Sequence, residues 1–181
     1  MTEIYNSDYF KERGLEQKHF VQTLIWTHLF SPTKVLDVGC GLGHYIYAFK
    51  TFCNIEAHGC DLDSVVPLCP YKELEGSIKG CDVKQLCYKD NEFDFVMCYD
   101  TLEHIDEKDL DIALKELSRV CSKTVLLSVP TKGDPNLYLD DTHKIFRNME
   151  WWKYKVSKYF NIQPTIPSIP FAKQIILGVK K

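Results

Sequence analysis

Residues 34–43 read KVLDVGCGLG and combine an apolar run with a cluster of glycines. The run holds two valines and predicts a short buried strand. Gly39, Gly41 and Gly43 follow on alternate positions, and residues 44–50 have helical character. A strand, a glycine turn and a helix in this order place a ligand against bare backbone, because glycine lacks a Cβ and accepts positive φ. The pattern therefore predicts a cofactor site at the carboxyl end of a parallel strand.

The spacing of these glycines separates two classes of cofactor. A dinucleotide site with the pattern G-x-G-x-x-G needs glycine where His44 stands, and its pyrophosphate binds a helix N-terminus. S-adenosylmethionine has no phosphate, and its sulfonium and ammonium groups favour carboxylates such as Asp37. The segment DVGCGLG resembles the first motif of class I S-adenosylmethionine-dependent methyltransferases, in the small, single-domain, type 11-like group. This resemblance assigns five positions of the motif to the cofactor: Asp37, Gly39, Cys40, Gly41 and Gly43.

The resemblance covers nearly the whole chain of 181 residues and implies a single methyltransferase domain. The expected fold is α/β, with a doubly wound, mostly parallel seven-stranded sheet, helices on both faces and a C-terminal antiparallel strand. Residues 1–30 are expected to form an N-terminal helical cover, and residues 34–130 the cofactor-binding core. Residues 131–181 are expected to supply a substrate-side loop, a helix and a closing hairpin.

The spacing of apolar residues marks the individual elements. Phe20, Leu24 and Leu29 belong to a helical repeat and predict an amphipathic helix over residues 15–30. Further helices are expected over about 107–121 and 149–160, and strands over 55–60, 77–81, 93–97, 124–129 and 173–179. Another strand near residues 161–169 is expected to be short, because prolines interrupt it.

The composition indicates a globular protein, with 45% hydrophobic and 13% aromatic residues. No apolar run is long enough to predict a membrane span, and the polar start MTEIYNSDYF does not resemble a signal peptide, so a cytoplasmic location is expected. The eight cysteines include no C-x-x-C pair, which argues against a zinc knuckle, and they are expected to be reduced thiols.

The net charge of −3 is unevenly distributed along the chain. Residues from 132 onward include nine basic and four acidic side chains, whereas the first 131 include 13 basic and 21 acidic ones. The basic segment is interpreted either as a solvated surface or as a rim that attracts an anionic substrate.

Acidic residues stand at the tips of the second and third predicted strands. The second strand ends at Asp61, followed by Leu62, and a carboxylate there can accept both ribose hydroxyls of NAD or S-adenosylmethionine. Asp63 is the competing residue. The third strand ends at Asp82, which in the family accepts the adenine amino group while the N–H of Val83 faces a ring nitrogen. The alternative for Asp82 is a helix N-cap.

Residues 92–105, EFDFVMCYDTLEHI, resemble the fourth strand of the family and the turn after it. In a doubly wound sheet this strand lies beside the first, across the topological switch point. Tyr99, Asp100 and Leu102 are therefore expected to line the pocket near the transferable methyl group. A Glu-His pair such as Glu103 and His104 packs under the site in many relatives, so His104 is interpreted as a structural residue or as a catalyst.

The polar segment after the fifth strand holds Asp140, Asp141 and His143. Loops at this edge of a sheet commonly carry substrate specificity. A carboxylate–histidine group there can deprotonate a hydroxyl or amine, hold a divalent metal or cap the following helix, and the three interpretations stay open. His143 is the candidate general base, and no metal site is assigned.

The predicted function is methyl transfer from S-adenosylmethionine to an oxygen or nitrogen of a small-molecule or glycan-linked acceptor. A non-catalytic S-adenosylmethionine-binding adaptor that acts through a partner protein is the alternative, and the glycine spacing makes an NAD-dependent oxidoreductase a weaker one. A nucleic-acid substrate is disfavoured, because no N/D-P-P-Y-type segment follows the fourth strand and no basic stripe is interleaved with aromatics. No membrane association is expected, and a protein partner or a homodimer stays open.

Overall fold

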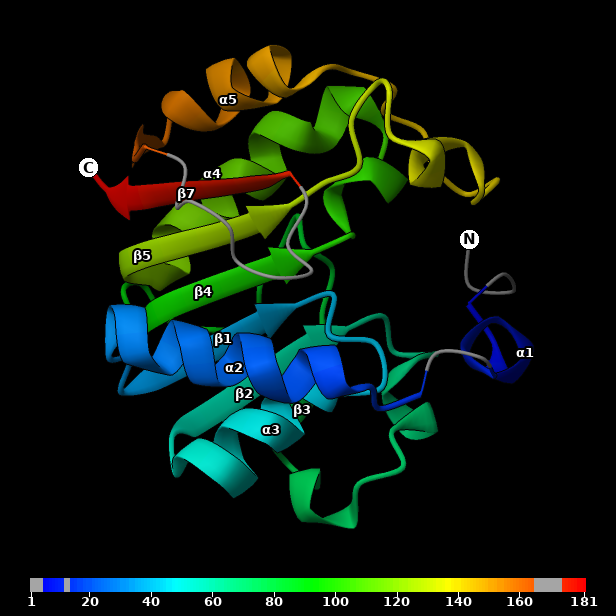
Figure 1. Ribbon diagram of the computed structural model, residues 1–181, viewed down its shortest axis with the longest axis vertical. Coiled ribbons are helices and arrows are strands. Elements are labelled where there is room, and N and C mark those ends of the chain that lie inside the picture. The colour runs from blue at the N-terminus through cyan, green and yellow to red at the C-terminus, as the bar shows by residue number, and fades with distance from the viewer. Residues whose placement is uncertain (1–4, 12–13, 165–173) are drawn as a thin grey trace.

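The computed structural model describes residues 5–11, 14–164 and 174–181, and it contains one seven-stranded sheet (Figure 1). The strands are β1 (Lys34–Val38), β2 (Glu56–Asp61), β3 (Ile78–Gly80), β4 (Phe93–Tyr99), β5 (Cys121–Ser128), β6 (Phe160–Ile162) and β7 (Ile175–Lys180). The α-helices are α1 (Ser7–Phe10), α2 (Gln17–Phe30), α3 (His44–Cys53), α4 (Leu110–Val120) and α5 (Met149–Ser157). Within these described ranges, no helix is long and apolar enough to cross a membrane.

The strand order β3-β2-β1-β4-β5-β7-β6 confirms the expected doubly wound sheet. Strands β1 to β5 pair in parallel, whereas β7 runs antiparallel to both β5 and β6. The first and fourth strands lie side by side, with Asp37 opposite Met97. Their carboxyl ends therefore open onto the same edge, at the switch point where such sheets bind ligands.

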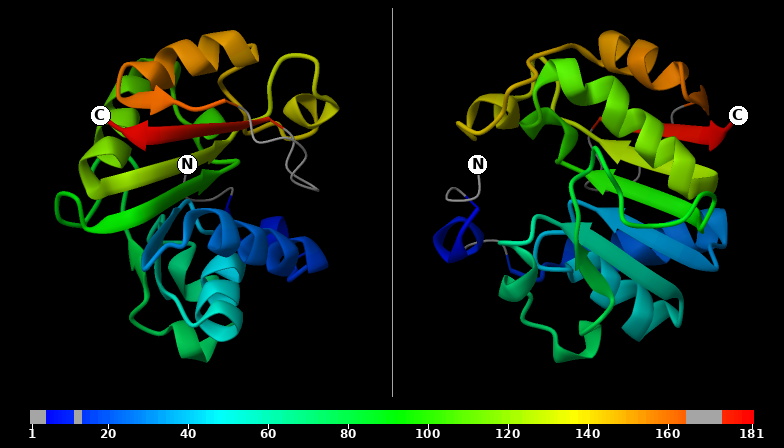
Figure 2. Two further views of the ribbon diagram at one scale, coloured as in Figure 1. Left: turned by 60° about the vertical axis from the view of Figure 1, so that its left-hand side comes forward. Right: turned by 180° about the vertical axis from the view of Figure 1, so that it is seen from behind.

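Helices cover both faces of the sheet (Figures 1 and 2). Successive side chains of a strand point to opposite faces, so each central strand contributes side chains to the hydrophobic core on either face of the sheet. From β4, Phe95 and Met97 pack with Trp26 and Phe49 on the side of α2 and α3. On the other side, residues of β4 and β5 pack with α4 and α5. Every one of these four named side chains is fully buried.

Helix α2 forms where the sequence predicts it, but with a different buried face. Its buried residues are His19, Gln22, Thr23 and Trp26, whereas the predicted apolar position Leu24 is 53% exposed and Leu29 is 47% exposed. Trp26 inserts between the aromatic rings of α3 and β4, and the side-chain Oε1 of Gln22 accepts a hydrogen bond from the Tyr45 hydroxyl. One large aromatic and a polar contact thus set the orientation of the helix.

Several boundaries move from their expected positions. A 3-10 turn at Glu107–Asp109 precedes α4, β5 begins at Cys121, and α5 ends at Ser157. The region before β3 forms two 3-10 turns, Val66–Leu68 and Lys72–Leu74. Strand β6 is short, as the prolines predict, and most of the predicted 161–169 segment lies outside the described residues.

The expectation that all eight cysteines are reduced thiols is wrong for one pair. The structure joins Cys81 and Cys87 in a disulfide, which closes the loop after β3. The remaining six are free, and Cys40, Cys60 and Cys98 are buried in the core. The two cysteines are six residues apart in the sequence, so a search for C-x-x-C pairs does not detect them.

Candidate functional site

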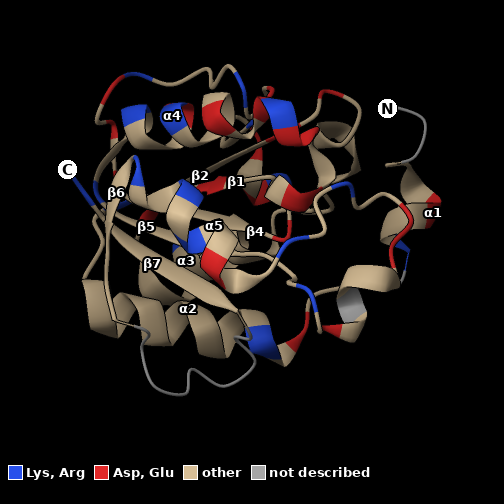
Figure 3. Ribbon diagram, turned by 90° about the horizontal axis from the view of Figure 1, so that it is seen from above, with Lys and Arg blue, Asp and Glu red and all other residues tan. Residues whose placement is uncertain are grey.

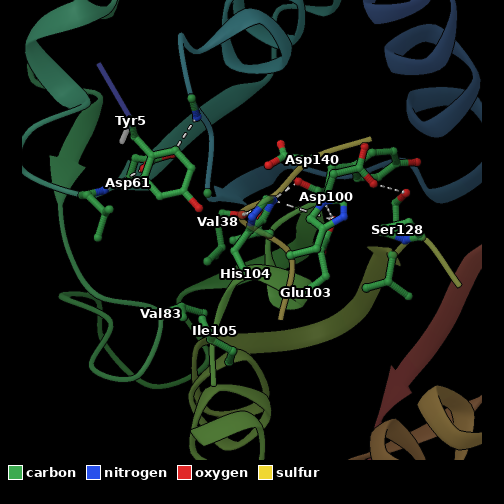
Figure 4. A pocket seen from close by; sticks show the side chains of 18 of the residues that line it. Tyr5, Val38, Asp61, Val83, Asp100, Glu103, His104, Ile105, Ser128 and Asp140 are labelled. Atoms are coloured by element: carbon green, nitrogen blue, oxygen red, sulfur yellow. Dashed lines mark hydrogen bonds and ion pairs between the residues drawn. The ribbon is translucent and has the colours of Figure 1, made fainter. Parts of the chain in front are cut away.

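A cleft of about 1020 Å³ opens at the carboxyl edge of the parallel strands. Nine of the residues predicted from the sequence line it: Gly39, Gly41, Asp61, Leu62, Asp82, Val83, Tyr99, Asp100 and His143. Figure 4 shows Asp61 on one side of the cleft, and Asp100, Glu103 and His104 grouped away from it. The tips of β1, β2 and β4 thus contribute to one concave surface, as a switch-point site requires.

The glycine turn after β1 is held against the tip of β2. The N–H groups of Gly39 and Cys40 both donate to the carbonyl oxygen of Cys60, at 2.8 and 3.1 Å. Gly39 adopts φ +75°, and a Cβ there would overlap the side chain of Thr101. Only glycine fits this close approach between the β1 turn and the β4 turn.

Asp61 is fixed by two backbone donors before any ligand binds. Gly41 N–H donates to Oδ2 and Leu62 N–H donates to Oδ1, each at 2.7 Å. Burial raises the pKa of this carboxyl, and the two hydrogen bonds partly offset that rise. Because each carboxylate oxygen has a second lone pair, Asp61 retains acceptor capacity toward the cleft, which suits a ribose diol.

Four residues predicted to bind the cofactor do not line the cleft: Asp37, Cys40, Gly43 and Leu102. Leu102 is fully buried in the core, and Cys40 packs against Gly59. Gly43 is the N-cap of α3 with φ +80°. Asp37 is 2% exposed, and burial together with the nearby Asp61 raises its pKa to about 8. A role for these four positions toward the cofactor stays a prediction.

The tips of β3 and β4 supply the remaining predicted positions. Asp82 lines the cleft while its Oδ1 accepts the N–H of Lys84 at 2.8 Å, which closes a local turn. No helix begins between β3 and β4, a stretch that the structure describes throughout, so the helix N-cap interpretation is wrong. Asp100 has φ +46°, and its Oδ1 accepts the Ser128 hydroxyl at 2.9 Å. Burial raises the pKa of Asp100. Tyr99 packs against Trp26 in the core beneath the cleft.

The predicted group of Asp140, Asp141 and His143 is only partly assembled. His143 and Asp140 line the cleft, whereas Asp141 does not. The His143 ring faces Glu103 instead, with Nε2 3.9 Å from Oε1. Asp140 accepts hydrogen bonds from Thr142 and Tyr9, and these lower its pKa below the ordinary value although burial acts to raise it.

Glu103 lines the cleft, although the sequence analysis treats it only as a packing residue. It is completely buried, and burial with the nearby Asp100 raises its pKa well above the ordinary value. The side chains of both His104 and His143 approach it. The only sequence signal is the adjacent Glu-His pair in TLEHI, because the contribution of His143 depends on a loop 40 positions after Glu103.

The cleft is strongly acidic. Its lining includes nine carboxylates and two lysines: Glu16, Asp61, Asp82, Asp100, Glu103, Asp106, Asp109, Asp134 and Asp140 against Lys18 and Lys84. A concave surface of one charge sign concentrates ligands of the opposite sign. The cleft therefore favours cationic ligands over anionic ones.

Comparison with known proteins gives a family and a distant relative. A family model described as a methyltransferase domain matches residues 36–129, more than half of the chain. The uncharacterized protein MJ0638 of Methanocaldococcus jannaschii is 29% identical over 113 residues, which cover 62% of this chain and 47% of that protein. The chain thus spans about half the length of the curated relative it matches.

Solved structures share the fold. A SAM-dependent methyltransferase from Archaeoglobus fulgidus has a TM-score of 0.69 and 21% identity, covering 94% of this chain and 97% of that one. Magnesium protoporphyrin IX methyltransferase from Synechocystis, solved with bound SAH, has a TM-score of 0.68 and 18% identity, covering 95% and 88%. The matched segment contains both motifs recognised in the sequence, and the match confirms the predicted family. The chain belongs to the methyltransferase domain family.

Proposed function

We propose that this chain transfers the methyl group of S-adenosylmethionine to an oxygen or nitrogen of a small-molecule acceptor, free or linked to a glycan. The observation that carries the proposal is Asp61, whose carboxylate is held by two backbone N–H groups beside the glycine turn. A ribose diol fits this carboxylate, and the positive charge of S-adenosylmethionine fits the acidic lining of the cleft.

The acidic lining also restricts the class of methyl acceptor that the cleft favours. Acidic groups outnumber basic ones in the lining, which argues against a phosphorylated or polyanionic acceptor and against a nucleic acid. A neutral or cationic acceptor, such as an alcohol, phenol or amine, is the class that this cleft favours.

S-adenosylmethionine supplies an activated methyl group on a sulfonium. As the acceptor atom bonds to that carbon, the S–C bond breaks and its electron pair stays on sulfur. Positioning and exclusion of water account for much of the acceleration in such a reaction. Where the acceptor arrives protonated, His143 is the candidate base, because its Nδ1 hydrogen is donated to the carbonyl of Leu137 and Nε2 keeps a lone pair.

Isothermal titration with S-adenosylmethionine, S-adenosylhomocysteine and NAD tests the cofactor. We expect the first two to bind and NAD not to. Asp61→Ala should weaken binding by about 100-fold, because it removes hydrogen bonds to a charged group. Asp63→Ala, a neighbouring exposed carboxyl, is the matched control and should bind as the wild type does. Binding of NAD alone contradicts the proposal.

Methyl transfer from labelled S-adenosylmethionine to a panel of alcohols, phenols and amines tests the reaction. His143→Ala should lower kcat more than cofactor affinity, whereas equal loss of both indicates a structural role. Cofactor binding without transfer to any acceptor, alone or with added cell extract, favours the adaptor alternative.

A further inference from the structure

Three side chains from two separate parts of the sequence direct possible ligand atoms toward one point at the cleft. Glu103 and His104 belong to the turn Leu102–His104 after β4, and His143 belongs to the segment after β5. One ligand atom of each lies within 4.8 Å of the other two. Glu103 Oε1 is 4.0 Å from His104 Nε2 and 3.9 Å from His143 Nε2.

The backbone fixes this arrangement. The N–H groups of Lys144 and Ile145 donate to the carbonyl oxygen of Glu103, at 2.8 and 3.2 Å. These bonds fasten the loop that carries His143 onto the turn that carries the other two side chains. The imidazole rings of His104 and His143 then lie 4.7 Å apart, centre to centre. All three residues line the cleft, and Glu103 is the fully buried one.

Hydrogen bonds on the far side of each ring determine which nitrogen carries the proton. His143 Nδ1 lies 2.9 Å from the carbonyl of Leu137, which can only accept, so Nδ1 carries the hydrogen. His104 Nδ1 lies 2.7 Å from the Thr142 hydroxyl, and that hydroxyl donates to the Asp140 carboxylate. Thr142 therefore accepts from His104 Nδ1–H. In the neutral His143 ring, Nε2 therefore presents a lone pair toward Glu103, and Nε2 of His104 lies 4.0 Å from the same carboxyl group.

Glu103 presents lone pairs as well. Its side chain is 0% exposed, and among the described residues neither carboxylate oxygen accepts a hydrogen bond. A buried carboxylate is costly without a counter-charge, and Oε1 lies beyond hydrogen-bond distance of both Nε2 atoms. A cation between the three atoms supplies that counter-charge.

We propose that Glu103, His104 and His143 bind one divalent first-row transition metal ion, such as Zn²⁺, at the acceptor end of the cleft. Two imidazole nitrogens and one carboxylate oxygen are ligands that such ions prefer, whereas Mg²⁺ and Ca²⁺ prefer oxygen. Metal-binding histidines commonly donate their other N–H to a carbonyl or a carboxylate-linked group, as Leu137 and the Thr142–Asp140 pair provide here.

The site departs from the sequence-based expectation that no metal is bound. Three protein ligands leave coordination positions open, and the cleft gives an acceptor oxygen access to them. Resting on the proposed function, this assigns the ion the role of binding an acceptor hydroxyl and lowering its pKa. In the metal-loaded protein, Nε2 of His143 is a ligand, and its role as a base is confined to the metal-free form.

The test is metal binding itself, measured without turnover. Protein stripped with a chelator is titrated with Zn²⁺ and Mg²⁺ by calorimetry, and Co²⁺ is added while its visible absorption is recorded. We expect one equivalent of Zn²⁺ to bind far more tightly than Mg²⁺, and Co²⁺ to give ligand-field bands without the intense charge-transfer band of thiolate ligands. Glu103→Gln and His143→Ala should each weaken Zn²⁺ binding by more than about 100-fold, and Thr142→Val should weaken it by about 10-fold.

Two controls separate the outcomes. His28→Ala removes an exposed histidine of α2 and should bind metal as the wild type does. The melting temperature, measured on every variant, reports whether each variant is folded. Loss of S-adenosylmethionine binding in the wild type counts against the proposed function alone. Zn²⁺ binding that is absent, or that Glu103→Gln leaves unchanged, overturns the metal site while the proposed function stands.

Discussion

Asp37 is a carboxyl group that the fold keeps from water at the end of β1. Burial, together with the nearby Asp61, raises its pKa to about 8 in the ligand-free protein. In the unfolded chain the same group titrates near its ordinary value of about 4. Between these two values the folded state holds a proton that the unfolded state has lost, so this group lowers stability as the pH rises from about 4 to 8.

Asp37→Asn should remove that part of the pH dependence. An amide stays neutral at every pH. The free energy of unfolding of the variant, relative to that of the wild type, should therefore rise by about 3 kcal/mol from pH 5 to pH 8. Urea unfolding of the ligand-free protein across this range measures it. Asp63→Asn changes an exposed carboxyl and should leave the slope unaltered. If the free energy of unfolding changed equally with pH in Asp37→Asn and in the wild type, the raised pKa of Asp37 in the folded protein would be refuted.

At the scale of elements, α1 reaches across the cleft to the segment after β5. The Tyr9 hydroxyl donates to Asp140 Oδ2 at 3.0 Å, and Tyr5, Tyr9 and Phe10 all line the cleft. This hydrogen bond to a charged group joins α1 to the far side of the cleft, so it contributes to keeping α1 in place.

Tyr9→Phe should therefore loosen α1 and speed cofactor release. Losing a partly exposed hydrogen bond to a carboxylate is expected to raise the dissociation rate of S-adenosylmethionine about 5–10-fold, with little change in the melting temperature. Stopped-flow fluorescence measures the rate. Tyr154→Phe, an exposed position on α5, should have no effect. A release rate equal to that of the wild type means that α1 does not cover the bound cofactor.

Most elements follow from local patterns, and the exceptions have physical reasons. The glycine turn and the strand tips depend on adjacent residues, so the sequence predicted Asp61 and Asp82 at the cleft. The buried face of α2 depends on Trp26 filling a space between α3 and β4, which helical spacing alone does not reveal. The Glu103–His143 contact is of the same kind, since it joins two loops through tertiary structure.

At the scale of the whole molecule, the charge asymmetry along the sequence is largely cancelled in space. Basic residues after position 132 pair with acidic ones that precede it, for example Lys144 with Asp106, Arg147 with Glu107 and Lys155 with Asp111. Figure 3 shows blue and red segments interspersed on α4 and α5, while α2 carries little charge. The basic segment thus neutralises its surroundings, and this favours the interpretation as a solvated surface over a rim for anions.

The excess of acidic over basic groups in the cleft lining should make cofactor binding sensitive to salt. S-adenosylmethionine carries one more positive charge than S-adenosylhomocysteine, so the field of the cleft acts more strongly on it. Raising the ionic strength from about 0.05 to 0.5 M shortens the screening length from more than 10 Å to about 4 Å. The Kd for S-adenosylmethionine should rise about 3–10-fold, and that for S-adenosylhomocysteine less, in parallel titrations at pH 7.5. Equal salt dependence for the two ligands would mean that the methyl-bearing sulfur lies outside this field, and the carboxylates of the cleft would then have to serve the acceptor instead.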